Sequence, residues 1–89
     1  MSTVLAMIEI DLHSPVPSYR QLADILRGRI ESGELGPRDA LPSITFLVQE
    51  TGLAVNTVRH AIRVLVDEGC VYVIPGRGTY VAPASERPK

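Results

Sequence analysis

The fold is decided by the stretch Leu53-Ala54-Val55-Asn56-Thr57-Val58-Arg59-His60-Ala61-Ile62-Arg63-Val64-Leu65. On a helix of about 3.6 residues per turn, this stretch separates into two faces. One face is apolar and has the i, i+3, i+4, i+7 spacing of a buried stripe: Val58, Ala61, Ile62 and Leu65. The other has the same spacing, contains no carboxylate, and presents amide, imidazole and guanidinium groups: Asn56, Arg59, His60 and Arg63. Such a helix packs through its first face and can place its second in the major groove of DNA.

The segments on either side of this helix, which we expect over residues 54–68, indicate a helix-turn-helix with a wing. A short helix with Ser43 as its N-cap is expected before the turn Thr51-Gly52-Leu53. After the long helix come two runs with the composition of strands, joined by a glycine-rich hairpin: Cys70–Ile74, Pro75-Gly76-Arg77-Gly78 and Thr79–Ala82.

Another amphipathic helix is expected earlier in the chain, from Tyr19 to Ser32. Ser18 is its expected N-cap, and Gly33 is its expected stop, because glycine best tolerates the positive φ that follows a helix. Residues 1–12 alternate weakly, which indicates a short N-terminal strand or an ordered arm, and residues 34–40 have the composition of a loop. The fold class is therefore α+β and mostly α: a winged helix-turn-helix of three helices followed by a two-stranded β wing. We expect an N-terminal arm over 1–16, the winged helix-turn-helix over 17–82 and a flexible tail over 83–89.

The charge is nearly balanced overall but unevenly distributed. Nine basic and ten acidic residues give a net charge of −1, which argues against a protein that coats DNA without sequence preference. Residues 54–66, however, carry Arg59, His60 and Arg63 and no acid. Local charge decides whether a surface can approach phosphate. The balance therefore predicts modest affinity for DNA and a need for a second subunit or a partner.

Composition argues against several other classes of protein. The 89 residues suffice for one hydrophobic core. Cys70, the only cysteine, is expected to be buried as a small apolar residue, and no Cys/His cluster has the spacing of a metal site. No Ser/His/Asp order, phosphate loop or carboxylate pair indicates catalysis, so we expect no catalytic residue, no metal, no cofactor and no enzyme. Without a signal peptide or a membrane-spanning apolar stretch, a cytoplasmic location is expected.

Six segments follow one another in an informative order: Pro17-Ser18-Tyr19-Arg20-Gln21-Leu22-Ala23-Asp24-Ile25-Leu26-Arg27, Ile30-Glu31-Ser32-Gly33-Glu34-Leu35-Gly36-Pro37, Leu41-Pro42-Ser43, Asn56-Thr57-Val58-Arg59, Glu68-Gly69 and Gly76-Arg77-Gly78-Thr79-Tyr80-Val81. In this order they resemble the DNA-binding domain of the GntR family of bacterial transcription regulators. The resemblance spans nearly the whole chain. It implies a sequence-specific regulator that binds a palindromic operator in double-stranded DNA as a dimer, with the helix at 54–68 in the major groove and the wing tip at 75–78 at the minor groove.

The same resemblance implies roles for individual residues. Asn56, Thr57 and Arg59 would meet bases or phosphates, and Arg77 with its flanking glycines would meet the minor groove. Arg63 has the alternative of an ion pair with Asp67, four residues further along the helix. The candidate DNA-binding residues are Ser43, Thr45, Asn56, Thr57, Arg59, His60, Arg63, Gly76, Arg77 and Gly78.

The chain departs from the family pattern at three places. Ile44 and Thr45 replace an acid and an arginine that often touches DNA. Ala54 and Val55 replace a capping serine and an arginine that reaches DNA; one alternative is therefore a helix that begins later, with Asn56 as its N-cap and turned toward the backbone. Family members normally continue into an effector-binding domain, whereas this chain ends eight residues after the last motif. No small-molecule effector is therefore inferred.

Two other functions stay open at this point. A winged helix without a sensor also suits a small architectural DNA-binding protein of a plasmid or phage. The missing arginines suit a protein-interaction module that heterodimerises with or modulates another regulator. A homodimer or heterodimer is expected because one module of this size buries only ~600–1,000 Å² on DNA. The candidate interfaces are the arm from Val4 to Ile10 and two apolar positions that we expect to be exposed, Val55 and Val64.

Overall fold

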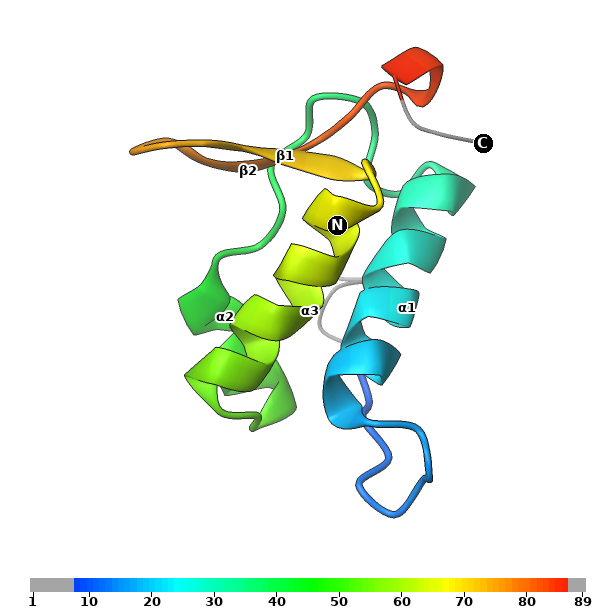
Figure 1. The fold of residues 1–89 in the computed structure, drawn as a ribbon, viewed down its shortest axis with the longest axis vertical. Helices are drawn as coiled ribbons and strands as arrows, with labels where there is room; N and C mark the ends of the chain where they lie inside the picture. The colour runs from blue at the N-terminus through cyan, green and yellow to red at the C-terminus, as the bar shows by residue number, and fades with distance from the viewer. Residues whose placement is uncertain (1–7, 87–89) are drawn as a thin grey trace.

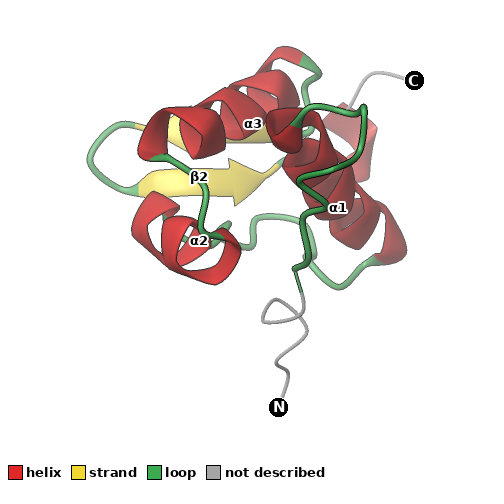
Figure 2. Ribbon diagram, turned by 90° about the horizontal axis from the view of Figure 1, so that it is seen from below, coloured by secondary structure: helices red, strands yellow, loops and turns green. Residues whose placement is uncertain are grey.

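The computed structural model describes residues 8–86, which form three α-helices, a β-hairpin and a short 3₁₀ helix (Figure 1). In chain order these are α1 (Ser18–Ser32), α2 (Ile44–Thr51), α3 (Val55–Asp67), β1 (Val71–Ile74), β2 (Gly78–Val81) and η2 (Ala84–Glu86). α1 and α3 lie side by side, and the hairpin lies at the C-terminal end of α3. Figure 2, seen from below, shows the hairpin behind α2 and α3. The winged helix-turn-helix predicted from the sequence is confirmed.

The capping of α1 differs from the prediction at one end. Its N-cap is Pro17, and the prediction of Ser18 is wrong because Ser18 is already helical. The carbonyl of Pro17 accepts hydrogen bonds from the N–H groups of Arg20 and Gln21, and the restricted φ of proline, here −58°, suits the residue that leads into a helix. At the other end Gly33 adopts φ 93° and ends α1, as predicted.

The segment before α1 is irregular where it is described. The short strand expected within residues 1–12 is absent from residues 8–12, and residues 1–7 lie outside the described part of the chain. The side-chain amide of Gln21 holds this segment instead: it accepts from the N–H of Asp11 and donates to the carbonyls of Asp11 and Val16, each at 2.8 Å. Ile8 is buried in the core. The segment is therefore fixed to α1 by side chains instead of by a sheet.

The helix-turn-helix is defined by its caps. Ser43 is the N-cap of α2, as predicted, and its Oγ accepts from the N–H of Phe46 at 3.0 Å. Gly52 ends α2 with φ 74°. α3 begins at Val55, with Ala54 as an N-cap that makes no side-chain hydrogen bond. The alternative of Asn56 as N-cap is wrong, because the Ala54 carbonyl already accepts the first helical bond; Asn56 is the second residue of α3 and is exposed.

Gly52 and Gly28 give opposite predictions for the same substitution. Gly52→Ala is expected to cost about 1–2 kcal/mol of stability, because φ 74° is a left-handed conformation. Gly28→Ala is expected to add about 0.5–1 kcal/mol, because Gly28 lies inside α1 and nothing lies within 4 Å of an added Cβ. Thermal unfolding followed by circular dichroism measures both. Equal melting temperatures for the two variants would contradict the assignment of the turn.

The core lies between α1 and α3 and is closed by α2 and the base of the hairpin. The apolar stripe predicted for α3 is buried. It packs in one cluster with these other buried residues: Ile8, Leu22, Ala23, Leu26, Ile30, Leu35, Leu41, Leu47, Leu53, Val71 and Val81. Two predictions of burial differ from the structure. Cys70 was expected to be buried and is half-buried, and Val64 was expected to be exposed and is half-buried against the core. With its apolar stripe inside, α3 turns its polar face to solvent.

The wing is attached to the helices by a third chain segment, 38–41, of which residues 38–40 were predicted only as loop. β1 and β2 pair in antiparallel register from Val71 opposite Val81 to Ile74 opposite Gly78. Three backbone hydrogen bonds of 2.8–2.9 Å join the segment 38–41 to β2: from Arg38 N–H to the Val81 carbonyl, from Val81 N–H to the Asp39 carbonyl and from Leu41 N–H to the Thr79 carbonyl. Since α2 follows directly after this segment, the bonds fix the wing relative to α2.

Candidate nucleic-acid interface

The polar face of α3 is open to solvent. Asn56, Arg59, His60 and Arg63 are all exposed, and Thr57 is half-buried. No side chain caps the start of the helix, so N–H groups of its first turn remain available as donors at the positive end of the helix dipole. α3 therefore offers hydrogen-bond donors along its exposed face, from the backbone N–H groups of its first turn to the guanidinium of Arg63.

The arginines divide into two groups by their partners. Arg27, Arg29 and Arg38 each form an ion pair: with Asp24 and Glu68, with Glu34 and with Glu86, respectively. The other group has no carboxylate within ion-pair distance among residues 8–86: Arg20, Arg59, Arg63 and Arg77. The second group lies at the start of α1, on α3 and at the wing tip. Among residues 8–86, no acid forms an ion pair with any of these four arginines.

The ion pair considered between Arg63 and Asp67 is absent from the described part of the chain. On a helix, a base placed four residues before an acid is the less favourable orientation, because the acid-first order also complements the helix dipole. Arg63 instead lines a groove between α3 and the wing, together with Arg59.

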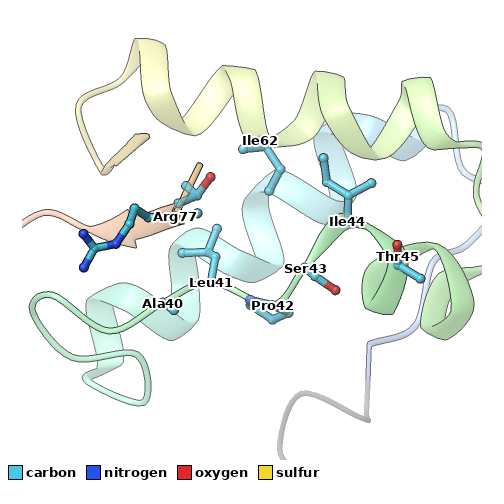
Figure 3. Close-up of a pocket in the computed structure, with 10 residues that line it drawn as sticks. Ala40, Leu41, Pro42, Ser43, Ile44, Thr45, Ile62 and Arg77 are labelled. Carbon is cyan, nitrogen blue, oxygen red and sulfur yellow. The ribbon is translucent and has the colours of Figure 1, made fainter. Parts of the chain in front are cut away.

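Two grooves join the start of α2, α3 and the wing into one concave surface. The groove beside Arg59 and Arg63 has a volume of about 350 Å³ and is otherwise lined by Ile44, Ile62, Val66, Val73 and Thr79. A second groove of about 330 Å³ brings the predicted residues Ser43 and Thr45 together with the wing residues Arg77 and Gly78 (Figure 3). Ile44, Ile62 and Thr79 line both grooves. Figure 3 shows the Arg77 guanidinium pointing away from Ser43 and Thr45.

The wing tip has a defined backbone conformation. The Arg77 N–H donates to the Ile74 carbonyl at 2.9 Å, and Gly76, with φ 79°, supplies the positive φ that this turn requires. Gly78 follows with φ 139°. The Tyr80 hydroxyl donates to the Arg77 carbonyl at 3.3 Å. Arg77 itself is exposed at the tip of this hydrogen-bonded turn.

A cluster of side chains lies on the outer face of the wing. Tyr72 and Tyr80 lie opposite each other in the register and stack with their ring centroids 6.0 Å apart. Arg38 donates to the Tyr72 hydroxyl at 2.8 Å, and this bond is the main cause that raises the pKa of Arg38 above its ordinary value. Since Val71 and Val81 face the core, this cluster lies on the opposite side of the sheet from α3.

On the side of α3 toward α1, His60 has a partner that sequence reasoning missed. Its ring stacks on Tyr19 with the centroids 3.8 Å apart and the planes 11° from parallel. The guanidinium of Arg20 lies 5.7 Å from the Tyr19 ring centroid. Tyr19 and Arg20, at the start of α1, therefore lie beside the polar face of α3 and extend it. The motif Ser18-Tyr19-Arg20 was present in the sequence, but nothing local showed that it would meet His60.

Arg27 connects α1 to the end of α3. Its guanidinium donates to both carboxylate oxygens of Glu68, at 2.8 and 3.0 Å, and also forms an ion pair with Asp24. These hydrogen bonds, the one to Glu68 foremost, raise the pKa of Arg27 further above its ordinary value, so the charge is present wherever the protein is folded. The pair with Glu68 joins residues 41 positions apart and holds the two long helices together.

Arg27→Ala is expected to lower stability by about 1 kcal/mol, because it removes the bidentate hydrogen bond to Glu68. The Arg27 side chain is only 22% exposed. For a domain of this size that corresponds to a melting temperature lower by about 4–8 °C. Arg63→Ala is the matched control, since Arg63 is exposed and has no ion pair among the described residues. Equal melting temperatures for these two variants would show that the Arg27 link has no structural role.

Among residues 8–86, no three side chains of His, Cys, Asp or Glu gather where they could hold a metal ion. No helix there is long and apolar enough to cross a membrane.

Comparison with known proteins agrees with this arrangement. Residues 18–81 match the family described as "Bacterial regulatory proteins, gntR family". Among curated relatives, the HTH-type transcriptional repressor NagR of Bacillus subtilis is 40% identical over 75 residues, which make up 84% of this chain and 31% of NagR. The chain thus spans less than a third of the length of that relative.

Solved structures show the same fold. YtrA from Sulfolobus acidocaldarius, a GntR-family transcription factor, matches with a TM-score of 0.77 and 42% identity over 88% of this chain and 81% of the other. AraR(DBD), in a crystal structure with operator ORX1, matches with a TM-score of 0.78 and 31% identity over 84% of this chain and 96% of the other. Since the family match covers most of the chain and carries the helices, the turn and the wing, this protein belongs to the GntR family of regulatory proteins.

Proposed function

We propose that this chain is a transcription regulator that binds double-stranded DNA sequence-specifically through α3 and the wing. The observation that carries the proposal is the placement of the unpaired arginines: within residues 8–86, Arg59, Arg63 and Arg77 border the concave surface and have no acid partner. Local cationic charge on a chain with a net charge of −1 suits selective binding better than general DNA coating. The relatives support the same function, since NagR is named a transcriptional repressor and AraR(DBD) was solved with operator DNA.

In this proposal each group of candidate residues has a separate role. Asn56 and Arg59, in the first turns of α3, contact base edges in the major groove, where amide and guanidinium groups can form paired hydrogen bonds. Arg77 enters the minor groove, because the glycines beside it permit close approach. The hydroxyl groups and the remaining cations contact phosphates: Ser43, Thr45, Thr57, His60 and Arg63. The Ser43 hydroxyl accepts from a backbone N–H, and its own hydrogen stays available for a phosphate.

The proposal extends to assembly and cellular role. Residues 17–82 act as the DNA-binding unit, with 1–16 as an arm and 83–89 as a tail. One unit covers only ~600–1,000 Å² of DNA, so two copies, or this chain and a related regulator, bind an inverted repeat. By analogy with NagR, occupation of the operator represses transcription. The chain works in the cytoplasm, where it meets the DNA, and performs no enzymatic reaction.

Selection of binding sites from a random duplex library at moderate salt, followed by sequencing, tests this function. Enrichment of an inverted repeat is the expected result and also gives the operator. Enrichment of a single half-site would support specific binding but overturn the pairing of two copies on DNA. A folded protein that enriches no sequence would contradict the proposal and favour the protein-interaction function.

A further inference from the structure

The first residue of α3 is an apolar side chain without a place in the core. Val55 is 44% exposed and does not belong to the hydrophobic cluster. By contrast, the half-buried residues Ile44, Val64 and Val66 all pack against that cluster. Packing of the hydrophobic core therefore does not explain why this position carries an apolar side chain.

Val55 stands at the end of α3 that reads DNA in the proposed function. It precedes Arg59 by four residues and so lies one turn before it on the same helix face. Its neighbours Ala54 and Asn56 are exposed as well. A helix in the major groove contacts base edges with its N-terminal residues, so Val55 is placed to meet a base.

The isopropyl group restricts which base this can be. It can neither donate nor accept a hydrogen bond. Of the groups displayed in the major groove, the hydrogen-bonding edges of guanine, cytosine and adenine need a polar partner, whereas thymine also offers its C5-methyl group. An arginine at the same position would favour guanine, through paired hydrogen bonds to O6 and N7.

We propose that Val55 is a specificity-determining residue that selects thymine at one position of each half-site by packing against its C5-methyl group. This proposal rests on the proposed function, because it needs α3 in the major groove.

The test uses deoxyuridine, which lacks the C5-methyl group of thymidine and keeps its hydrogen-bonding edge. Each thymine of the selected duplex is replaced in turn, and the dissociation constant is measured. One replacement per half-site is expected to weaken binding about fourfold, the value of one buried methyl group. Val55→Ala is expected to lose this discrimination without loss of thermal stability, because alanine is the better helix former. Val55→Arg is expected to shift the selected base to guanine.

Val16→Ala is the matched control, since Val16 is 40% exposed and lies outside α3 and the wing; it should keep the full deoxyuridine penalty. Wild-type binding that no deoxyuridine weakens overturns the proposal, as does a penalty that persists unchanged in Val55→Ala. A wild-type chain that binds no duplex at all overturns the proposed function itself, so the two failures are told apart.

Discussion

Arg59→Ala is expected to weaken binding to the selected duplex about 10- to 100-fold and to relax sequence preference at the contacted base. Arg59 is exposed, lies in the second turn of α3 and has no carboxylate partner among the described residues. Its guanidinium is therefore free to bind the DNA and contributes little to folding. Fluorescence anisotropy with the labelled duplex and with single-base variants of it measures both effects, while the melting temperature should stay unchanged.

Arg38→Ala serves as the control for this prediction. It removes the same single charge, but Arg38 lies on the outer face of the wing and bonds to Tyr72 and Glu86. Any loss that comes only from overall charge should appear equally in both variants. Equal affinities for Arg59→Ala and Arg38→Ala would contradict the assignment of α3 as the recognition helix.

Leu65→Ala is expected to cost about 2–5 kcal/mol of stability. Leu65 is fully buried at 0% exposure in the cluster formed by α1 and α3, so truncation leaves a cavity between the two long helices. Domains as small as this one are stabilised by about 5–15 kcal/mol at most, so the variant should lose a large part of its stability. Urea unfolding monitored by circular dichroism gives the shift in midpoint.

Leu12→Ala is the same chemical change at a residue that is 71% exposed. It is expected to change stability by no more than about 0.5 kcal/mol. If Leu65→Ala were as stable as Leu12→Ala, the packing of α3 on α1 described above would be wrong.

The features that the sequence predicted are those determined by local chemistry. The apolar stripe of α3 is a matter of helical spacing, and every one of its four residues is buried. Gly33 was predicted from the need for positive φ after a helix, and Ser43 from the preference for a hydroxyl before one. Both stand in those positions. The wing followed from two short strand-like runs around a glycine-rich turn, and its register is antiparallel as a hairpin requires.

The features that the sequence did not predict depend on partners far away in the chain. The pairing of the segment 38–41 with β2, the stacking of Tyr19 on His60 and the link between Arg27 and Glu68 each join elements that only the folded chain brings together. No periodicity or capping rule reports such contacts. For the candidate site, the consequence is that Tyr19 and Arg20 were not predicted as an extension of the polar face of α3.

The errors at helix starts have a different cause. Ser18 and Asn56 are both good capping residues, yet each is already inside its helix. In α1 the carbonyl of Pro17 begins the helix, and in α3 the carbonyl of Ala54 does so. The helix starts are thus set by backbone conformation one or two residues earlier. As a result, the side chain of Asn56 remains free for the role that the proposal gives it.

The most direct test of the central claim is a nuclear magnetic resonance titration of the ¹⁵N-labelled chain with the selected duplex. We expect the largest amide shift changes at residues 43–45, 55–63 and 76–78, and little change at residues 25–32 in the second half of α1. Changes centred on residues 25–32, with α3 and the wing tip unaffected, would contradict the assignment of α3 and the wing as the DNA-binding surface.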